Sequence, residues 1–373
     1  MSGGESWAIM PRNLEDNPCL YSPGIKWDVA PGGFTHMTEL FGPVLAVMPY
    51  RNLNEAIQLV HQTGYGLTSG LESLDDREQV QWSNRLRAGN LYINRPTTGA
   101  IVLRQPFGGL GKSAFGPGIK AGGPNYVVPL LNHPTIADLA ALNGTFGKPP
   151  TELEQTLREP LHELWQRLRN APDPCALGVR NRLSAEQWSA LSQMIVDFDR
   201  FGAEEIAREH DTLRLIGQDN IRRYLPLTHM RIRVTADDQA VDIMARIVAA
   251  RAAGGRAVVS ATAGVHAELL HQLVELTDGW GASIEFLEES DEQLIQEIAR
   301  HQVDRLRYAS PRAVSHAVRA AANEAFVAIA DSPVAALGRV ELLWYVREQS
   351  LCVDYHRYGN LGARSGEPRT EPL

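Results

Sequence analysis

The residues best suited by type to bind a phosphate group are Gly111, Lys112 and Ser113. The same three residue types, in the same order, end the sequence motif of a phosphate-binding loop. That motif also requires a glycine five positions before its second glycine, and Pro106 stands there. The surrounding sequence predicts neither a strand that leads tightly into this tripeptide nor a helix that leaves it. A nucleotide-binding loop of this type is therefore not expected.

Two further patterns suggest ligands but lack the required spacing. His266 and His271 are five residues apart, whereas the histidines of a zinc-binding H-E-x-x-H helix are four apart and share one face. At about 100° per residue the two rings diverge, so surface histidines on an amphipathic helix are the better interpretation. Residues 260–264 (SATAG) form the turn where a dinucleotide fingerprint would lie, but the turn lacks the G-x-G-x-x-G pattern. We expect a Rossmann-like unit there without a cofactor, and no metal site.

The elements around the first motif alternate between strands and helices, which is typical of an α/β unit with a mainly parallel sheet. In residues 1–145 a buried strand is expected at 44–48, other strands at 67–71, 90–94 and 126–131, and helices at 52–63 and 75–87. Asn52 suits the start of the first helix as a cap, and Gly89 suits the end of the second. A glycine-dense stretch at 95–129 either lines a site or is a long surface connection.

The rest of the chain is predicted to form a helical connector and a second α/β unit. Residues 146–214 are charged and helical, with Ser184 as a cap and with Trp165 and Trp188 in the core. Residues 215–373 alternate again, with strands expected at 230–234, 256–261, 283–287, 306–308 and 325–330 and helices at 238–251, 265–276 and 291–301. The sequence therefore predicts the α/β fold class, with a Rossmann-like C-terminal domain and a tail.

Composition limits the classes of protein to which the chain can belong. A length of 373 residues suggests two or three domains. A net charge of −8 disfavours nucleic-acid binding, which needs a basic surface. Three widely spaced cysteines indicate a reducing compartment, and the chain has neither a secretory leader nor a run of about 18 apolar residues. We expect a cytoplasmic protein with no transmembrane segment and no nucleic-acid partner.

Four sequence blocks carry a specific family resemblance. In chain order they are 39–45 (ELFGPVL), 65–70 (YGLTSG), 87–94 (RAGNLYIN) and 106–109 (PFGG). Their identity, order and spacing resemble the aldehyde dehydrogenase superfamily. The resemblance implies that residues 1–145 are the C-terminal part of an aldehyde dehydrogenase catalytic domain, with its oligomerisation strand, and that the Rossmann-like domain is of the same superfamily type.

Other segments narrow the resemblance within that superfamily. Residues 95–109 and 120–126 (KAGGPNY) are similar to L-glutamate γ-semialdehyde (Δ1-pyrroline-5-carboxylate) dehydrogenases. Residues 11–14 and 25–29 resemble the dehydrogenase half of bifunctional proline utilization A proteins, and residues 341–362 resemble the tail of the longer members. The resemblance implies the second step of proline catabolism to glutamate.

The resemblance also implies roles for individual residues. Those proteins transfer a hydride from an aldehyde, attacked by a cysteine thiolate, to NAD⁺. By analogy Glu39 binds the ribose hydroxyls of the nicotinamide half of NAD, and Phe41 packs against the nicotinamide. Thr98, Gly99 and Ala100 map to the loop that anchors the substrate carboxylate, which backbone N–H groups can bind. Phe107 maps to an aromatic wall around the substrate's aliphatic part.

The catalytic cysteine and general-base glutamate of this superfamily precede the E-x-F-G-P block by more than 38 residues, so we expect both upstream of this chain. Cys19 is interpreted as a small buried residue, Cys175 as part of a proline-flanked loop and Cys352 as part of the tail. The cofactor domain is mostly missing, and FAD is expected only in the absent proline dehydrogenase part. The chain is therefore expected to be a C-terminal fragment that is inactive alone.

The expected partners are the substrate L-glutamate γ-semialdehyde, the remainder of the same enzyme and further copies in a homo-oligomer. An alternative of a different class is a noncatalytic module that serves oligomerisation or covers the substrate tunnel of a partner. The exposed edges of a truncated sheet predict self-association of the isolated chain.

Overall fold

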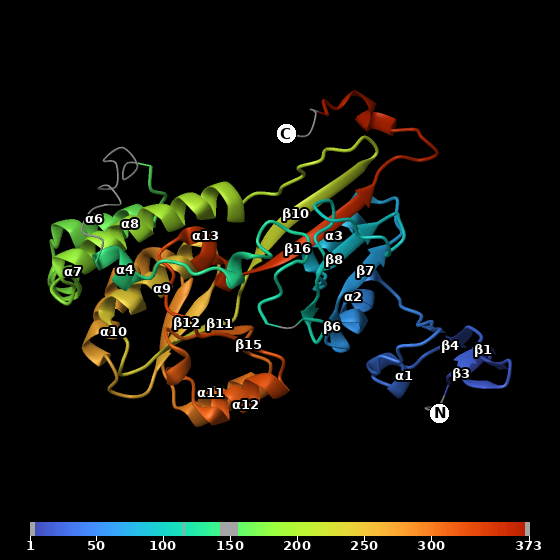
Figure 1. Cartoon of the computed structure of the whole chain (residues 1–373), viewed down its shortest axis with the longest axis horizontal. Coiled ribbons are helices and arrows are strands. Elements are labelled where there is room, and N and C mark those ends of the chain that lie inside the picture. The colour runs from blue at the N-terminus through green and yellow to red at the C-terminus, as the bar shows by residue number, and fades with distance from the viewer. Residues whose placement is uncertain (1–3, 115, 142–155, 370–373) are drawn as a thin grey trace.

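The computed structural model describes residues 4–114, 116–141 and 156–369. Two α/β units are joined by helices and by a pair of long strands, β10 and β16, that run from one unit to the other (Figure 1). Within the described ranges, no helix is both long and apolar enough to cross a membrane. The α/β fold class expected from the alternation of elements is confirmed.

The first unit is built around two short parallel strands that two helices flank. The strands are β7 (Thr68–Leu71) and β8 (Asn90–Ile93), and the helices are α2 (Leu53–Gln62) and α3 (Asp76–Arg85). The cap predicted for the first helix is confirmed, because the Asn52 side chain accepts the Glu55 N–H at 3.1 Å. Gly89 does not end the second helix, whose C-terminal cap is Leu86.

The C-terminal part of the chain completes the sheet of the first unit. Strand β10 (Gln218–Pro226) pairs antiparallel with β16 (Val346–Asp354), and β16 pairs parallel with β8, so that the sheet order is β10-β16-β8-β7. Ser350 lies opposite Asn90 in this register. Neither long strand is among the sequence predictions. The residues of β16 belong to the tail, which is identified by its resemblance to a family and not by a strand pattern.

The N-terminal residues form small separate sheets. A three-stranded sheet contains β1 (Ser6–Ile9), β4 (Gly24–Trp27) and β5 (Val44–Ala46), a hairpin contains β2 (Asn13–Leu14) and β3 (Asn17–Tyr21), and α1 (Phe34–Met37) follows. The strand expected to be buried at 44–48 is β5, and it is half-buried to exposed because it lies at the edge of its sheet. Strand β6 (Tyr65–Gly66) pairs with β9 (Leu110–Gly111), which fastens the glycine-rich segment to the first unit.

The connector is helical, as predicted, over its described part. Its helices are α6 (Leu161–Asn170), α7 (Pro174–Arg180) and α8 (Ala185–Phe201), and a π-helical turn (Gly202–Ile206) follows α8. Helix α4 (Ile136–Ala141) lies before residue 146, where the connector was predicted to begin. Ser184 forms the predicted cap of α8, within a capping box that Gln187 closes. Trp165 is buried and Trp188 packs against the same core.

The second unit is a five-stranded parallel sheet of order β13-β12-β11-β14-β15, which is the order 3-2-1-4-5 of the first five strands of a Rossmann fold. Its strands are β11 (Met230–Val234), β12 (Ala257–Ala261), β13 (Ile284–Glu288), β14 (Arg305–Arg307) and β15 (Ala328–Ala330). Its helices are α9 (Ala240–Ala252), α10 (Ala267–Thr277), α11 (Asp291–Ala299), α12 (His316–Glu324) and α13 (Gly338–Glu341). The alternation predicted for 230–330 is confirmed, apart from α12, which is not among the predictions.

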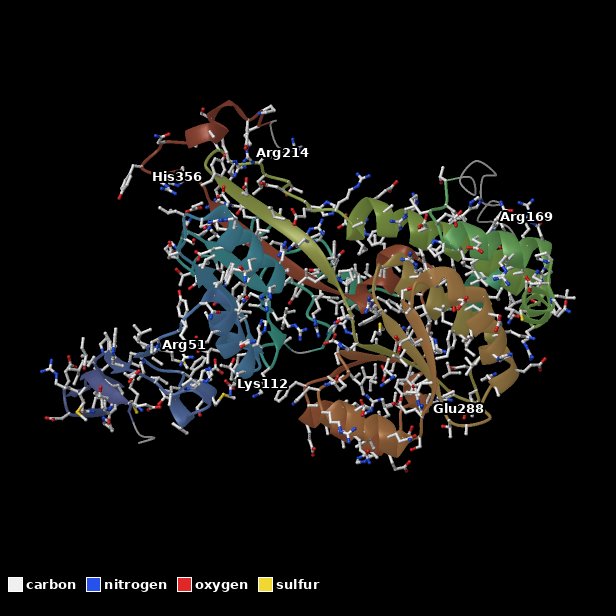
Figure 2. The ribbon with its side chains drawn as sticks, turned by 180° about the vertical axis from the view of Figure 1, so that it is seen from behind. Arg51, Lys112, Arg169, Arg214, Glu288 and His356 are labelled. Atoms are coloured by element: carbon white, nitrogen blue, oxygen red, sulfur yellow. The ribbon has the colours of Figure 1, made fainter. Side chains whose placement is uncertain are left out.

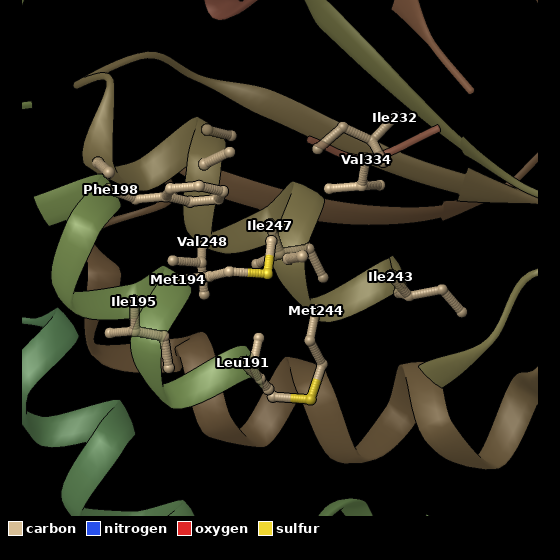
Figure 3. Close-up of a cluster of buried hydrophobic side chains, with 14 of the residues drawn as sticks. Leu191, Met194, Ile195, Phe198, Ile232, Ile243, Met244, Ile247, Val248 and Val334 are labelled. Atoms are coloured by element: carbon tan, nitrogen blue, oxygen red, sulfur yellow. The ribbon is translucent and has the colours of Figure 1, made fainter. Parts of the chain in front are cut away.

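One core joins the connector to the second unit. Leu191, Met194 and Phe198 of α8 pack against Met244 and Val248 of α9, and all five are fully or almost fully buried (Figure 3). The main cluster of buried apolar residues extends from the connector through this sheet to β16. The helical connector is thus a layer of the second unit.

Candidate functional site

The residues mapped to substrate binding lie in a loop that leaves the carboxyl end of β8. Thr98, Gly99 and Ala100 are exposed, and Gly99 adopts a positive φ of 78° with open space where a side chain would stand. Within the described part of the chain, no group accepts the backbone N–H of these three residues. Because the carboxyl ends of parallel strands are a usual place for ligands, the loop offers free donors where an anion can reach them.

Both long strands hold this loop in place. Arg95 donates to the Cys352 thiol at 2.9 Å, and Gln105 donates to Cys352 at 3.2 Å and to Asn220 at 2.6 Å. The Arg104 guanidinium also donates to the side chain of Gln218 in β10, at 2.5 Å. The loop at 95–105 is therefore attached at both ends to residues that lie more than a hundred positions later in the sequence.

Phe107 begins the glycine-rich segment and is half-buried. Its N–H and carbonyl bond the carbonyl and N–H of Ala121, at 2.9 and 2.8 Å, which closes residues 107–121 into a loop. The segment at 126–131, expected to be a strand, forms a turn and a short 3₁₀ helix (Val128–Leu130) instead. Gly89 lies against this segment, and a side chain there would collide with the carbonyl of Gly108.

A buried polar cluster fastens the glycine-rich segment to the long strands. Lys120 is fully buried and bonds the Gly108 carbonyl, while its backbone N–H donates to Glu348 at 3.2 Å. Asn125 donates to both Glu348 and the Tyr224 hydroxyl, the latter at 2.7 Å. Burial lowers the pKa of Lys120 to about 7, against the attraction of Glu348, and raises the pKa of Glu348.

The residues mapped to cofactor binding lie elsewhere in the first unit. Glu39 is exposed and borders a cavity of about 670 Å³ between the N-terminal segment and α2. Phe41 is 94% exposed and has a positive φ of 46°. A bulky residue in this conformation costs about 1–3 kcal/mol, so the backbone holds an apolar ring in solvent at a cost.

The structure does not bring the two predicted sets together in one cavity. None of Thr98, Gly99, Ala100 and Phe107 lines the cavity that Glu39 borders. The substrate set shares one segment, since Thr98 and Phe107 both lie in the stretch that follows β8 and ends at Phe107.

The chain's three cysteines lie in different elements. Cys19 is exposed in β3, which contradicts the expected burial, and Cys175 lies in the first turn of α7 and not in a loop. Cys352 is buried in β16, and burial raises the pKa of its thiol, which disfavours the thiolate. In the described ranges, no group of three or more His, Cys, Asp or Glu side chains is placed to hold a metal ion.

The sequence predictions missed the residues that position the loop. The pairing of β10 and β16 beside β8 is what brings together Asn220, Gln105 and Cys352. No local sequence pattern predicts that pairing. Lys120 lies in the KAGGPNY segment, which was used for the resemblance but was given no role.

Comparison with known proteins shows which families this chain resembles. Residues 1–133 match the model of the aldehyde dehydrogenase family, so this part of the chain is similar to that family. Bifunctional protein PutA of Salmonella typhimurium is 35% identical over 248 residues, which are 63% of this chain and 16% of that protein. A 1-pyrroline-5-carboxylate dehydrogenase of Geobacillus thermodenitrificans is 37% identical over 140 residues, 37% of this chain and 25% of that protein.

The whole fold also has a solved counterpart. The structure of proline utilization A (PutA) from Corynebacterium freiburgense has a TM-score of 0.64 and 29% identity to this chain, and it covers 96% of this chain and 30% of that one. The resemblance of this chain to PutA and to 1-pyrroline-5-carboxylate dehydrogenases is thus confirmed. The chain spans less than a third of the length of each of these relatives.

Proposed function

We propose that this chain supplies part of an NAD-dependent L-glutamate γ-semialdehyde dehydrogenase, the second step of proline catabolism to glutamate. The observation that carries the proposal is the loop at 95–105, which offers Thr98, Gly99 and Ala100 to an anion and is held by both long strands. The similarity to a 1-pyrroline-5-carboxylate dehydrogenase supports this substrate, which carries an α-carboxylate.

In this proposal the chain's residues bind and orient, and the reacting thiolate comes from elsewhere. The N–H groups of the loop bind the α-carboxylate, and Phe107 packs against the aliphatic part of the substrate. The raised pKa of the Cys352 thiol and its burial support a structural role for that residue. The remainder of the same enzyme supplies the nucleophile and base, so the chain alone is inactive.

In the same proposal, exposed residues of the N-terminal segment bind NAD. The Glu39 carboxylate accepts hydrogen bonds from two ribose hydroxyls at the edge of its cavity, and the Phe41 ring packs on the nicotinamide. The cavity of about 670 Å³ and the nearly complete exposure of Phe41 fit such a ligand. Bound there, NAD⁺ would supply the hydride acceptor for oxidation of the aldehyde. We further propose a homo-oligomer in the cytoplasm as the working form.

Binding of the product tests the substrate loop without requiring turnover. L-Glutamate is titrated into the ¹⁵N-labelled chain, and the amide resonances of Thr98, Gly99 and Ala100 are expected to shift together with a millimolar Kd. γ-Aminobutyrate is the control ligand, because it lacks the α-carboxylate and is expected to leave these amides unmoved. Gly99→Val, which places a β-branched residue at positive φ, is expected to abolish the shifts. Equal shifts with both ligands would contradict the proposal.

A further inference from the structure

A second cleft, which the proposed function does not use, lies between the two units. It has a volume of about 860 Å³, and its walls are the glycine-rich residues 110–118 except 115 on one side and β14, β15 and α12 on the other. Figure 2 shows Lys112 at the edge of the first unit that faces these elements. A cleft of this size accommodates a small molecule of several hundred daltons.

The lining of the cleft carries an excess of positive charge. Four cationic side chains line it (Lys112, Arg305, Arg319 and Arg347), against the single carboxylate of Asp304. Arg347 pairs with Asp304 at 2.8 Å, and Arg319 pairs with Asp331, outside the lining, at 2.8 Å. The Lys112 amine donates to the carbonyl of Thr63, at 3.1 Å, and lies over the ring of Tyr65.

Arg305 is a buried cation whose hydrogen-bond partners are all neutral. Its guanidinium donates to the carbonyls of Leu343, Trp344, Val346 and Pro117, at 3.3, 2.6, 3.1 and 2.8 Å. Among the described residues it forms no ion pair, and its Nε has no partner. Burial and the nearby Arg347 lower the pKa of Arg305 to about 9. An anion in the cleft relieves this unfavourable charge, because little water separates it from the guanidinium.

Part of the wall that the second unit forms is apolar. Phe326 is 55% exposed, and Val327, Ala328 and Ile329 continue the surface behind it. The glycine-rich wall adds backbone donors, since within the described ranges neither Gly116 nor Gly118 has an acceptor for its N–H. The cleft therefore joins a cationic end to an apolar surface that suits a planar ring.

We propose that this cleft binds a small molecule with a phosphate group and a planar ring, of the nucleoside diphosphate class. The phosphates lie among Lys112, Arg305 and Arg319, and the ring lies against Phe326. Lys112 thus acts in a site between the units and not in a phosphate-binding loop of the strand–loop–helix type, which its flanking sequence excludes. The site shares no residue with the substrate loop and shares Ser113 alone with the lining of the cavity that Glu39 borders, so it does not rest on the proposed function.

Isothermal titration calorimetry of the full chain with ADP tests the proposal. ADP is expected to bind the wild type, inorganic phosphate at least tenfold more weakly, and adenosine at least tenfold more weakly. Arg319→Ala and Lys112→Ala are each expected to raise the Kd for ADP about tenfold, because each removes one charged donor. Phe326→Ser is expected to raise the Kd for ADP but to leave that for phosphate unchanged.

The matched control is Arg312→Ala, which removes an exposed cation of the same unit outside the cleft. It is expected to leave the Kd for ADP unchanged, with the far-ultraviolet circular dichroism of every variant equal to that of the wild type. Absence of ADP binding to the folded wild type would overturn the proposal. Equal loss of affinity in Arg312→Ala and Arg319→Ala would overturn it as well, because it would show nonspecific charge attraction.

Discussion

At the scale of single residues, Lys120 is a buried group whose ionisation near neutral pH changes on folding. Its amine leaves water, and its pKa falls from 10.5 in the unfolded chain to about 7 in the folded one. Between these two values the unfolded chain binds one more proton than the folded chain. The free energy of unfolding therefore rises with pH through this window, and below pH 7 the full cost of the buried charge remains.

Replacing Lys120 tests this linkage. In the wild type the free energy of unfolding is expected to rise between pH 7.5 and 9.5 by on the order of 1 kcal/mol per pH unit from this group. Lys120→Met keeps the length of the side chain but removes the charge, so this contribution is expected to vanish. Urea unfolding at the two pH values measures it. Lys112→Met, at an exposed lysine, is the control, and an equal change in both variants would contradict the account.

At the scale of elements, the sequence predictions succeeded where a pattern is local. The period of apolar residues and the caps Asn52 and Ser184 mark α2 and α8 correctly, because a helix forms its hydrogen bonds within one segment. Strands β10 and β16 were missed because their partners lie far apart in sequence, and β16 meets β8 across some 260 positions. The same pairing of distant strands places the residues that hold the loop at 95–105.

The predicted site residues divide in the same way. Glu39, Phe41 and Thr98 lie in local sequence blocks, so the family resemblance identifies them. The role of Cys352 and Asn220 in holding the loop is visible only in the folded structure. Cys19 was expected to be buried because cysteine usually is, yet β3 belongs to a small two-stranded sheet with no core beneath it.

The contact between β16 and the loop predicts an effect on the motion of the loop. Cys352→Ala removes the sulfur that accepts from Arg95 and Gln105, so the amides of Ile101 and Leu103, which donate to Gln105 and Gly122, are expected to exchange hydrogen at least several-fold faster. Hydrogen exchange measured by mass spectrometry reports this change. Cys175→Ala, in α7, is the matched control and is expected to leave the loop unchanged. Equal exchange in Cys352→Ala and wild type would show that the loop does not depend on β16.

At the scale of the whole molecule, the N-terminal segment exposes an apolar surface. Trp27, Phe34, Phe41, Leu45 and Tyr50 are each more than half exposed. Single exposed apolar residues are ordinary, but several on one small unit mark a surface that another protein segment covers. The isolated chain is therefore expected to self-associate through this segment.

Sedimentation velocity measures this association. The wild type is expected to sediment as species larger than 41.1 kDa, in a concentration-dependent way. Phe34→Lys with Trp27→Lys is expected to shift the distribution toward the monomer. Leu177→Lys, at an exposed leucine of α7, is the control and is expected to leave it unchanged. A wild type that sediments as a monomer at all concentrations would contradict this interpretation of the surface.

The central claim is that the chain binds substrate and cofactor groups but holds no activated thiol. The most direct test is NADH formation by the purified chain with L-glutamate γ-semialdehyde and NAD⁺, followed by absorbance. The account predicts no turnover above that of a buffer blank, in the same preparation whose loop amides respond to L-glutamate. Turnover that is lost in Cys19→Ala, Cys175→Ala or Cys352→Ala would contradict it, because the nucleophile would then lie within this chain.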